Sequence, residues 1–322
     1  MKVLITGGAG FIGSHLAGEL VKKGDEVYVI DDLSTGSEKN IKDLIKCGNF
    51  HFHRDTILNR ALMRDLIKKV DVIYHLAAAV GVKYIIDNPL ESIRVNVTGT
   101  EIVLGLADEM GKKKVIIAST SEVYGKNMRR KVSFKETDDR LMGPTTISRW
   151  SYACTKALDE FLALAYYREK RLPVVIIRFF NICGPRQTGR YGMVIPRFVK
   201  AALSNKPIIV YGDGRQTRSF THVKDAVSAI IKLAECKSCV GEIFNLGNSH
   251  AISINELATK VKKMAGNSSS IRHIPYEKAY EKGFEDMRHR RPDISKLREA
   301  VNFRPAHSID DILKDVIKNF KG

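Results

Sequence analysis

The feature that most constrains the fold is a glycine-rich turn near the start of the sequence. Lys2–Thr6 is a short run of β-forming residues, and it leads directly into the glycine-rich stretch Gly7–Gly13. A strand that enters a helix through such a turn points the helix N-terminus at a diphosphate. Gly7 allows the tight turn, Gly10 lets the backbone approach the pyrophosphate, and Gly13 lets the helix pack close to the sheet. The stretch therefore predicts a dinucleotide site, because it has the strand-to-helix context that the motif requires.

Two carboxylates at the end of the second predicted strand indicate which dinucleotide binds. Asp31 and Asp32 follow Val27–Ile30. A carboxylate at this position accepts hydrogen bonds from ribose hydroxyls and repels a 2′-phosphate. No Arg or Lys lies between Asp31 and Ser37 to receive such a phosphate, so the sequence favours NAD over NADP. The alternative is that both residues only form a turn. Asp55, after the third predicted strand, is a candidate for a bond to the adenine amine.

Strands and helices alternate through the first half of the chain. Short β-branched runs are separated by amphipathic helical patterns such as Phe11–Lys23 and Leu90–Met110. This alternation predicts an α/β fold with a doubly wound parallel sheet of the Rossmann type. The regularity falls after residue 180, where we expect a smaller α/β lobe that binds the substrate. We place the first domain at 1–180, with 221–248 returning to it, and the second at 181–322.

Composition limits the functions to consider. The chain has 322 residues, of which 44% are hydrophobic, and its net charge is +17. No apolar run reaches the roughly 18–20 residues that cross a membrane, and the first strand leaves no room for a signal peptide. We therefore expect a cytoplasmic protein without a membrane partner. The charge suits nucleic acid, an anionic substrate or a Lys-rich surface. Because aromatic residues do not interleave with the basic clusters 112–114 and 129–131, we expect no nucleic-acid partner.

The cysteines predict no metal site. Five are scattered along the chain, and an odd, scattered set is typical of a reducing compartment. Cys236 and Cys239 have metal-type spacing, but a structural zinc site needs four ligands and no second pair accompanies them. We therefore interpret these two as small residues at the end of a helix.

A phenol and an ammonium four residues apart are candidates for acid–base chemistry. On a helix, Tyr152 and Lys156 share one face. A nearby cation stabilises phenolate and lowers the pKa of a tyrosine toward that of a useful general base. The alternative is two ordinary helix residues, since this spacing is frequent by chance. The segment 118–125 supports the acid–base interpretation, because it ends the predicted strand that precedes this helix. Thr120 would then lie at the edge of the cleft, where it would share the substrate proton with Tyr152.

At this point the chain resembles a known family, the extended short-chain dehydrogenases that remodel sugar nucleotides. The resemblance covers essentially the whole chain, and its motifs are specific for the family and much less so for the member. It rests on Thr6–Gly13, Asp31, His75–Ala78, Asn96–Thr100, Thr120–Gly125, Tyr152, Lys156, Arg178–Pro185, Tyr211–Gly214 and His222–Asp225.

The resemblance implies a reaction and a set of roles. NAD takes hydride from C4 of a hexose while a tyrosine removes the hydroxyl proton, and the 4-keto sugar is then epimerised, dehydrated or decarboxylated. Tyr152 would be the base, Lys156 would orient the nicotinamide ribose, and Thr120 would bond the C4 oxygen. Asn181 and Arg218 match positions that hold the nucleotide diphosphate. A surface ion pair is the alternative for Arg218, although Arg suits bidentate phosphate contacts.

Glu122 separates the members of the family. A plain 4-epimerase needs no second acid here, whereas dehydratases and uronate decarboxylases carry Glu. Ser121 stands where typical dTDP-glucose dehydratases have Asp, which counts against that branch, while GDP-mannose dehydratases use a Ser–Glu pair. The segment 282–293 and the pair Arg149–Trp150 are similar to those of UDP-glucuronate decarboxylases.

The basic tail bears on the same choice. In those decarboxylases an Arg matching Arg290 faces the uronate, where a cation suits the carboxylate. In epimerases of the family, an Arg that matches a position near Arg288 binds the diphosphate. The sequence alone therefore does not show which of Arg288 and Arg290 binds the carboxylate and which binds the diphosphate. The segment 79–84, which contains Lys83, and the segment 191–196 look more like those of epimerases. Lys83 faces either the substrate or solvent.

The sequence therefore ranks several functions. UDP-glucuronate decarboxylation leads, a UDP-hexose or UDP-uronate 4-epimerase follows, and a 4,6-dehydratase is third. A non-catalytic NAD- or nucleic-acid-binding protein is disfavoured by the intact set of Thr120, Tyr152 and Lys156. Relatives pair through two helices that match Leu90–Met110 and Tyr152–Arg171, so we expect a homodimer.

The predicted site has three overlapping groups of residues. The cofactor residues are Gly7, Gly10, Phe11, Ile12, Gly13, Asp31, Asp32, Asp55, Leu76, Ala77, Ala78, Tyr152 and Lys156. The substrate residues are Lys83, Thr120, Ser121, Asn181, Arg190, Tyr211, Arg218, Arg288 and Arg290. The catalytic residues are Tyr152, Lys156, Thr120, Glu122 and Arg290.

Overall fold

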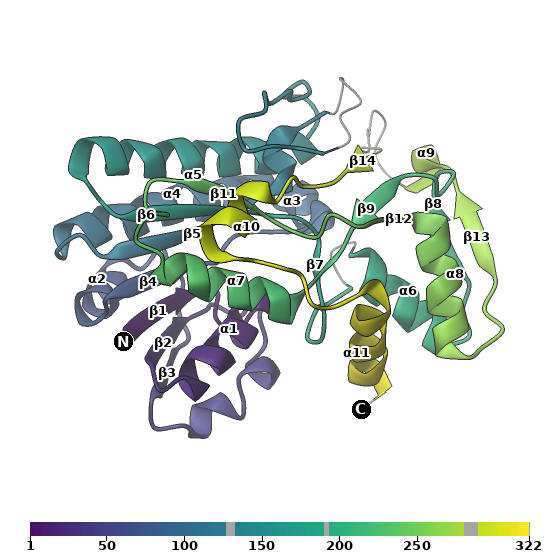
Figure 1. Ribbon diagram of the computed structural model, residues 1–322, viewed down its shortest axis with the longest axis horizontal. Helices are drawn as coiled ribbons and strands as arrows, with labels where there is room; N and C mark the ends of the chain where they lie inside the picture. Colours follow the sequence, from purple (N-terminus) through teal and green to yellow (C-terminus); the bar gives the residue numbers. More distant parts are fainter. Residues whose placement is uncertain (127–132, 190–192, 280–288, 322) are drawn as a thin grey trace.

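The centre of the molecule is a sheet of seven parallel strands. A computed structural model describes residues 1–126, 133–189, 193–279 and 289–321, and its strands follow the order β11-β6-β5-β4-β1-β2-β3 (Figure 1). The strand order reverses beside β1, which lies between β4 and β2, so the predicted doubly wound parallel sheet is confirmed. The strands are β1 (Lys2–Thr6), β2 (Glu26–Ile30), β3 (Phe50–His53), β4 (Val72–His75), β5 (Lys114–Thr120), β6 (Val174–Phe179) and β11 (Ile243–Leu246).

Helices cover both faces of the sheet, because successive side chains of a strand point to opposite faces. On one face α1 (Phe11–Lys22) and α7 (Val223–Glu235) pack over alternate residues of β1, β2 and β6. On the other face lie α2 (Arg60–Lys69), α4 (Pro89–Glu109) and α5 (Arg149–Lys170). The strands are rich in Val and Ile, as expected for strands that are buried on both faces.

The second half of the chain builds smaller sheets and a third core. This core is formed by apolar residues of α6 (Val194–Leu203), α8 (Ile254–Ala265) and α11 (Ile309–Lys321), which lie together beside the main sheet (Figure 1). The short strands pair as β7 (Ile182–Cys183) with β10 (Thr221–His222), β8 (Ile208–Tyr211) with β13 (Ile271–Ile274), and β9 (Thr217–Ser219) with both β12 (Ala251–Ser253) and β14 (His289–Arg290).

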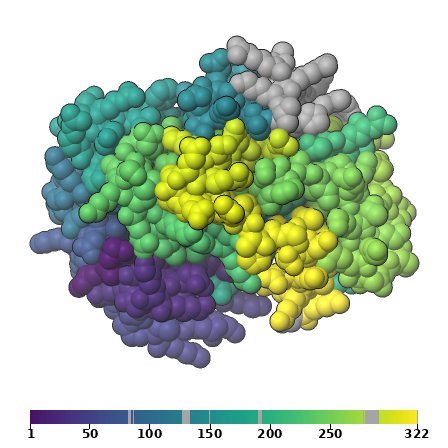
Figure 2. Space-filling model, viewed as in Figure 1, coloured from purple at the N-terminus to yellow at the C-terminus, as the bar shows by residue number. Residues whose placement is uncertain are grey.

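The chain passes between these two regions more than once. Segment 221–248 supplies β10, α7 and β11, and β11 extends the main sheet beside β6. The C-terminal segment, yellow in Figure 2, crosses the surface between the purple N-terminal region and the light-green residues of the third core. The domain boundary at residue 180 stays a prediction.

The remaining short elements are η1 (Glu38–Asn40), η2 (Leu44–Lys46), η3 (Ser121–Tyr124), α3 (Val82–Asp87), α9 (Tyr276–Ala279) and α10 (Ser295–Val301).

The structure corrects the interpretation of the paired cysteines. Cys236 and Cys239 lie just after α7, at the end of a helix as expected, but they form a disulfide that the sequence interpretation as two small residues did not include. Their separation of three along the chain brings the two Cα atoms to 5.5 Å, within the range that a disulfide spans.

Among the residues described, no group of three or more His, Cys, Asp and Glu side chains is arranged to hold a metal ion. No helix in the same ranges is long and apolar enough to span a membrane.

Candidate active site

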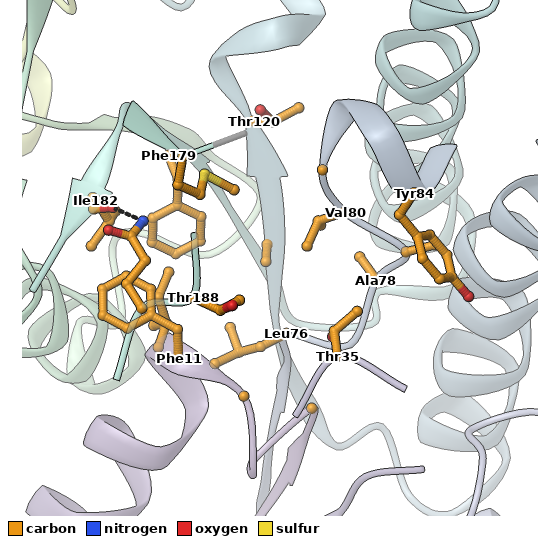
Figure 3. A pocket seen from close by; sticks show the side chains of 18 of the residues that line it. Phe11, Thr35, Leu76, Ala78, Val80, Tyr84, Thr120, Phe179, Ile182 and Thr188 are labelled. Carbon is orange, nitrogen blue, oxygen red and sulfur yellow. Dashed lines mark hydrogen bonds between the residues drawn. The ribbon is translucent and has the colours of Figure 1, made fainter. Parts of the chain in front are cut away.

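One cavity of about 820 Å³ lies at the carboxyl edge of the main sheet. Parallel sheets bind ligands at this edge, next to the strand where the order reverses. Its walls come from the turns that follow β1, β2, β4 and β5, and from the segments after β6. Figure 3 shows this convergence, with Phe11 on α1, Thr120 at the end of β5, and Ala78 and Tyr84 on the segment after β4.

The glycine turn has the shape of a phosphate cradle. Gly7 has a φ of +70°, and a Cβ atom there would lie 2.9 Å from the backbone of Ala77. At Gly13 a Cβ would lie 2.2 Å from the carbonyl oxygen of Gly7. Gly10 precedes the first turn of α1 without a capping side chain, so backbone N–H groups remain for an anion. These residues fit the pyrophosphate of a dinucleotide.

The acidic residues near this turn also hold the protein backbone. Asp31 accepts hydrogen bonds from the backbone N–H groups of Ala9 (2.9 Å) and Leu33 (2.8 Å). Burial raises the pKa of Asp31, while these N–H groups oppose the rise. Asp32 accepts from the N–H of Ser34 at 2.9 Å. Both carboxylates line the cavity, so they form a turn and also stand where a ribose would bind.

Asp55 lines the same cavity but is engaged by its own loop. One carboxylate oxygen accepts the N–H of Thr56 at 2.7 Å, and the other accepts the side-chain amide of Asn59 at 2.7 Å. Asn59 in turn caps α2. The carboxylate therefore organises the turn into α2 beside the place predicted for the adenine ring.

Thr120 and Tyr152 meet at the end of β5. Both side chains line the cavity, Thr120 from the end of β5 and Tyr152 from α5. Burial raises the pKa of Tyr152, and the charge of Glu122 adds to this rise, whereas Thr120 opposes it. The sequence predicted that Lys156 would lower this pKa; in the structure the Lys156 ammonium instead lies 2.8 Å from the carboxylate of Asp159. Lys156 is 2% exposed and does not belong to the described cavity wall.

A guanidinium and a carboxylate pair beside this phenol. Arg290 on β14 forms an ion pair with Glu122 on η3, and its Nη2 donates to Asn181 Oδ1 at 2.9 Å. Arg290 is 14% exposed and Glu122 is 22% exposed, so the pair is largely desolvated. The register of β14 on β9 also places Arg290 opposite Arg218. Two cations therefore approach the substrate end of the cavity together.

Most of the predicted residues come together in this cavity. Its wall includes Gly7, Gly10, Phe11, Ile12, Gly13, Asp31, Asp32, Asp55, Leu76, Ala77, Ala78, Thr120, Ser121, Glu122, Tyr152, Asn181, Tyr211, Arg218 and Arg290. Arg190 and Arg288 are not among the residues that the structure describes. Lys83 belongs to α3, but its side chain is not among those described.

Several residues of the cavity wall were missed by the sequence analysis. The Arg197 guanidinium lies 4.2 Å from the centre of the Tyr211 ring, and its Nε is buried with no hydrogen-bond partner among the described residues. Gln216 donates to the carbonyl of Tyr211 and to the hydroxyl of Tyr276, and its own carbonyl oxygen is also buried and unbonded there. The signal that was available for Arg197 is a cation within the otherwise apolar run 194–199 at the start of α6.

Comparisons with known proteins place the chain in a family. Residues 4–316 match the family model described as GDP-mannose 4,6 dehydratase, and the chain belongs to this family. It is 47% identical over 321 residues to UDP-N-acetyl-alpha-D-glucosaminuronate decarboxylase of Bacillus cytotoxicus, covering 99% of this chain and 98% of that protein. It is 37% identical to UDP-glucuronic acid decarboxylase 1 of Arabidopsis thaliana, covering 100% of this chain and 70% of that protein.

A solved structure supports the same assignment. The crystal structure of UDP-glucuronic acid 4-epimerase from Bacillus cereus in complex with UDP-glucuronic acid and NAD is similar to this fold with a TM-score of 0.89. The sequence identity is 31%, and the match covers 100% of this chain and 99% of that one. The resemblance to enzymes that remodel sugar nucleotides is therefore confirmed, for the decarboxylase and the epimerase branches alike.

Proposed function

We propose that this protein is an NAD-dependent decarboxylase of a UDP-linked uronate. The observation that carries the proposal is the contact of Arg290 with Glu122 and Asn181 beside Tyr152. A guanidinium is the group that best binds a planar carboxylate. The 47% identical relative, matched over nearly the whole length of both chains, is named for UDP-N-acetylglucosaminuronate, and this sugar joins UDP-glucuronate as a substrate to test.

We assign a role to each group of the cavity. The glycine turn and Asp31 hold the dinucleotide, and the chemistry that NAD supplies when bound is reversible acceptance of a hydride. Tyr152 takes the proton of the C4 hydroxyl, which Thr120 orients. A ketone at C4 lies β to the C6 carboxylate, so the C5–C6 bond breaks with its electron pair left on C5, and carbon dioxide departs. Arg290 positions the carboxylate, and Glu122 lies where it can exchange a proton with C5.

The far end of the cavity suits a nucleotide. Arg197, Tyr211 and Gln216 combine an aromatic ring with an unbonded donor and an unbonded acceptor, which is the surface that a heteroaromatic base requires. Arg218 and Asn181 line the cavity between this end and Tyr152, where the diphosphate of a UDP-sugar would lie.

A UDP-uronate 4-epimerase is the second candidate. It is favoured by the fold shared with the Bacillus cereus enzyme and by the segment 79–84, which resembles those of epimerases. Both candidates use the same oxidation at C4 and differ only in the fate of the ketone.

A homodimer and a cytoplasmic location are further parts of the proposal. Large apolar side chains of α4 and α5 are exposed, among them Leu90 (80%) and Phe161 (59%). Such a patch on two adjacent helices suits a second copy of the chain.

Proton NMR of the reaction products tests the proposed activity. The purified protein is incubated with NAD and either UDP-glucuronate or UDP-N-acetylglucosaminuronate. A pentose nucleotide, or its 4-keto form, with release of carbon dioxide is the expected result. A 4-epimer that keeps its carboxylate would support the second candidate, and two unchanged substrates would contradict both.

A further inference from the structure

A buried asparagine on the edge strand of the main sheet bonds to three other segments of the chain. Asn245 lies on β11 and is 0% exposed. Burying a side-chain amide costs free energy unless its donors and its oxygen are hydrogen-bonded. The neighbouring strand residues Phe244 and Leu246 are apolar. A polar side chain at this position therefore calls for an explanation beyond the packing of the sheet.

On one side, the amide is bonded to the turn that carries Glu122. Tyr124 ends η3, and its hydroxyl donates to Asn245 Oδ1 at 2.7 Å. Burial raises the pKa of Tyr124 to about 12, so the hydroxyl keeps its proton at neutral pH. The Tyr124 ring also stacks on Phe134, with the ring centroids 4.7 Å apart. Glu122 lies two residues earlier in the same short helix, so its backbone is fixed relative to Asn245.

On the other side, the amide is bonded to the segment that follows Arg290. Asn245 Nδ2 donates to the carbonyl oxygens of Phe134 (2.9 Å) and Asp293 (3.3 Å). These two partners are themselves paired, because the Asp293 N–H donates to the Phe134 carbonyl at 2.8 Å and the Phe134 N–H donates to the Arg291 carbonyl at 2.9 Å. Arg291 directly follows Arg290, so the backbone of Arg290 is also fixed relative to Asn245.

The bonds leave the amide one orientation. Only Nδ2 can face two carbonyl oxygens, and Oδ1 must then face the Tyr124 hydroxyl. The chain after β11 also packs closely on the same segment: a Cβ atom at Gly247 would lie 2.6 Å from Cγ of Pro292. A buried amide that is bonded in this way selects one arrangement of the segments around it.

We propose that Asn245 is a positioning residue that sets the Arg290 guanidinium against the Glu122 carboxylate by fixing the backbone that carries each of them. The two charged residues are 168 positions apart in the chain, and the Asn245 side chain bonds to the segments of both. Asn245 does not belong to the described cavity wall, so it acts through Arg290 and Glu122. The inference rests on the proposed function for the role of Arg290 toward a carboxylate.

Binding selectivity for a carboxylate tests this inference. Isothermal titration calorimetry of the full chain compares UDP-glucuronate with UDP-glucose, and UDP-N-acetylglucosaminuronate with UDP-N-acetylglucosamine. All proteins carry Tyr152→Phe, with which we expect no turnover. Before further substitution, at least one uronate should bind more tightly than its neutral counterpart. Asn245→Ala should reduce this ratio of dissociation constants about tenfold. When Arg290→Met is also present, Asn245→Ala should change the ratio by less than about twofold, because the group through which it acts is gone.

Asn49→Ala is the matched control. Asn49 also donates its side-chain amide to two backbone carbonyls, those of Val21 (3.2 Å) and Asp25 (2.8 Å). It directly precedes β3, at the amino edge of the sheet and opposite the cavity. Its loss should weaken the fold and leave the ratio unchanged, whereas a merely structural role of Asn245 would give this same result. Tyr124→Phe removes the hydroxyl that donates to Asn245 and keeps the ring. It should lower the ratio too, and it serves if Asn245→Ala fails to fold.

The outcomes separate this inference from the proposed function. An unchanged ratio in Asn245→Ala and Tyr124→Phe, or an equal loss with and without Arg290, would overturn the inference. Equal affinities for each uronate and its neutral counterpart before substitution at Asn245 would overturn it as well. An unchanged ratio together with carbon dioxide release by the wild type would overturn the inference alone. The expected fall in a protein whose wild type releases no carbon dioxide would support the inference while contradicting decarboxylation.

Discussion

Arg290 connects two residues that lie more than a hundred positions earlier in the chain. Its guanidinium is held between the carboxylate of Glu122 and the side-chain amide of Asn181, and two acceptors fix a planar group in one orientation. A uronate carboxylate entering the cavity would find this guanidinium already directed toward it. Such preorganisation lowers the cost of binding.

Replacing Arg290 should therefore impair turnover of uronates. In Arg290→Met the carboxylate of Glu122 loses its ion pair with Arg290, and a substrate carboxylate would be buried without a cation beside it. We expect kcat/KM for the UDP-uronate to fall roughly 100-fold, equivalent to about 3 kcal/mol. Steady-state kinetics measures this change.

Arg298→Met is the control, since Arg298 is an exposed cation on α10. It removes the same charge from the surface and should leave kcat/KM within a factor of two or so of the wild type, as usual for surface changes. Equal effects of the two substitutions would mean that only net charge matters, which would exclude the proposed carboxylate contact.

Residue types and spacings predicted much of this site, but not its pairings. The spacing of Tyr152 and Lys156 correctly placed both on one helix. It could not show that Asp159, three residues further on, binds the ammonium, because this depends on the burial of the helix face. Arg288 and Arg290 are equivalent in the sequence, and only the pairing of β14 with β9 brings Arg290 beside Arg218.

At the scale of elements, α5 is fastened to the sheet by a buried network. Glu160 accepts two hydrogen bonds from Arg178 on β6, at 2.9 and 2.7 Å. It also accepts the hydroxyl of Ser119 on β5. This two-pronged bond fixes the height of α5 along the strands. Because Tyr152 lies on the same helix, the network also fixes the phenol relative to Thr120.

Breaking that network should destabilise the fold. Glu160→Gln leaves the guanidinium of Arg178 buried without a counter-charge, so the free energy of unfolding should fall by about 3 kcal/mol. Urea denaturation followed by circular dichroism measures the loss. Glu169→Gln, on the exposed last turn of α5, should change stability by less than about 0.5 kcal/mol. A Glu160 variant as stable as the Glu169 variant would show that other contacts hold α5 in place.

The long elements followed from hydrophobic periodicity, and the short ones did not. The strand expected at Val27–Ile30 and the helix expected at Leu90–Met110 correspond to β2 and α4 within a residue or so. By contrast, β7 and β14 have only two residues each. Pairing across large sequence separations, rather than local pattern, creates such strands.

At the scale of the whole molecule, α4 and α5 present an apolar surface. Leu90, Ile93, Leu158 and Phe161 are 80%, 42%, 49% and 59% exposed. The two helices pack side by side, so these side chains gather on adjacent elements. Most other large apolar side chains are buried in the three cores.

A charge in this surface should separate the proposed dimer into monomers. Phe161→Glu would place two carboxylates in an apolar interface, where burying an unpaired charge is costly. Light scattering at micromolar concentration should give the mass of a dimer for the wild type and of a monomer for the variant. Phe320→Glu, on the C-terminal helix α11, is the control because Phe320 is 37% exposed and far from α5 in the sequence. A monomeric wild type would refute the dimer.

Removal of the carboxylate of a UDP-linked uronate is the reaction that we propose for this cavity. The most direct measurement is release of labelled carbon dioxide from UDP-N-acetylglucosaminuronate and UDP-glucuronate that carry the label in the carboxyl group. We predict stoichiometric release with the wild type in the presence of NAD, and none with Tyr152→Phe. Label that stays in the nucleotide sugar, with both substrates and with the wild type, would contradict decarboxylation by this protein.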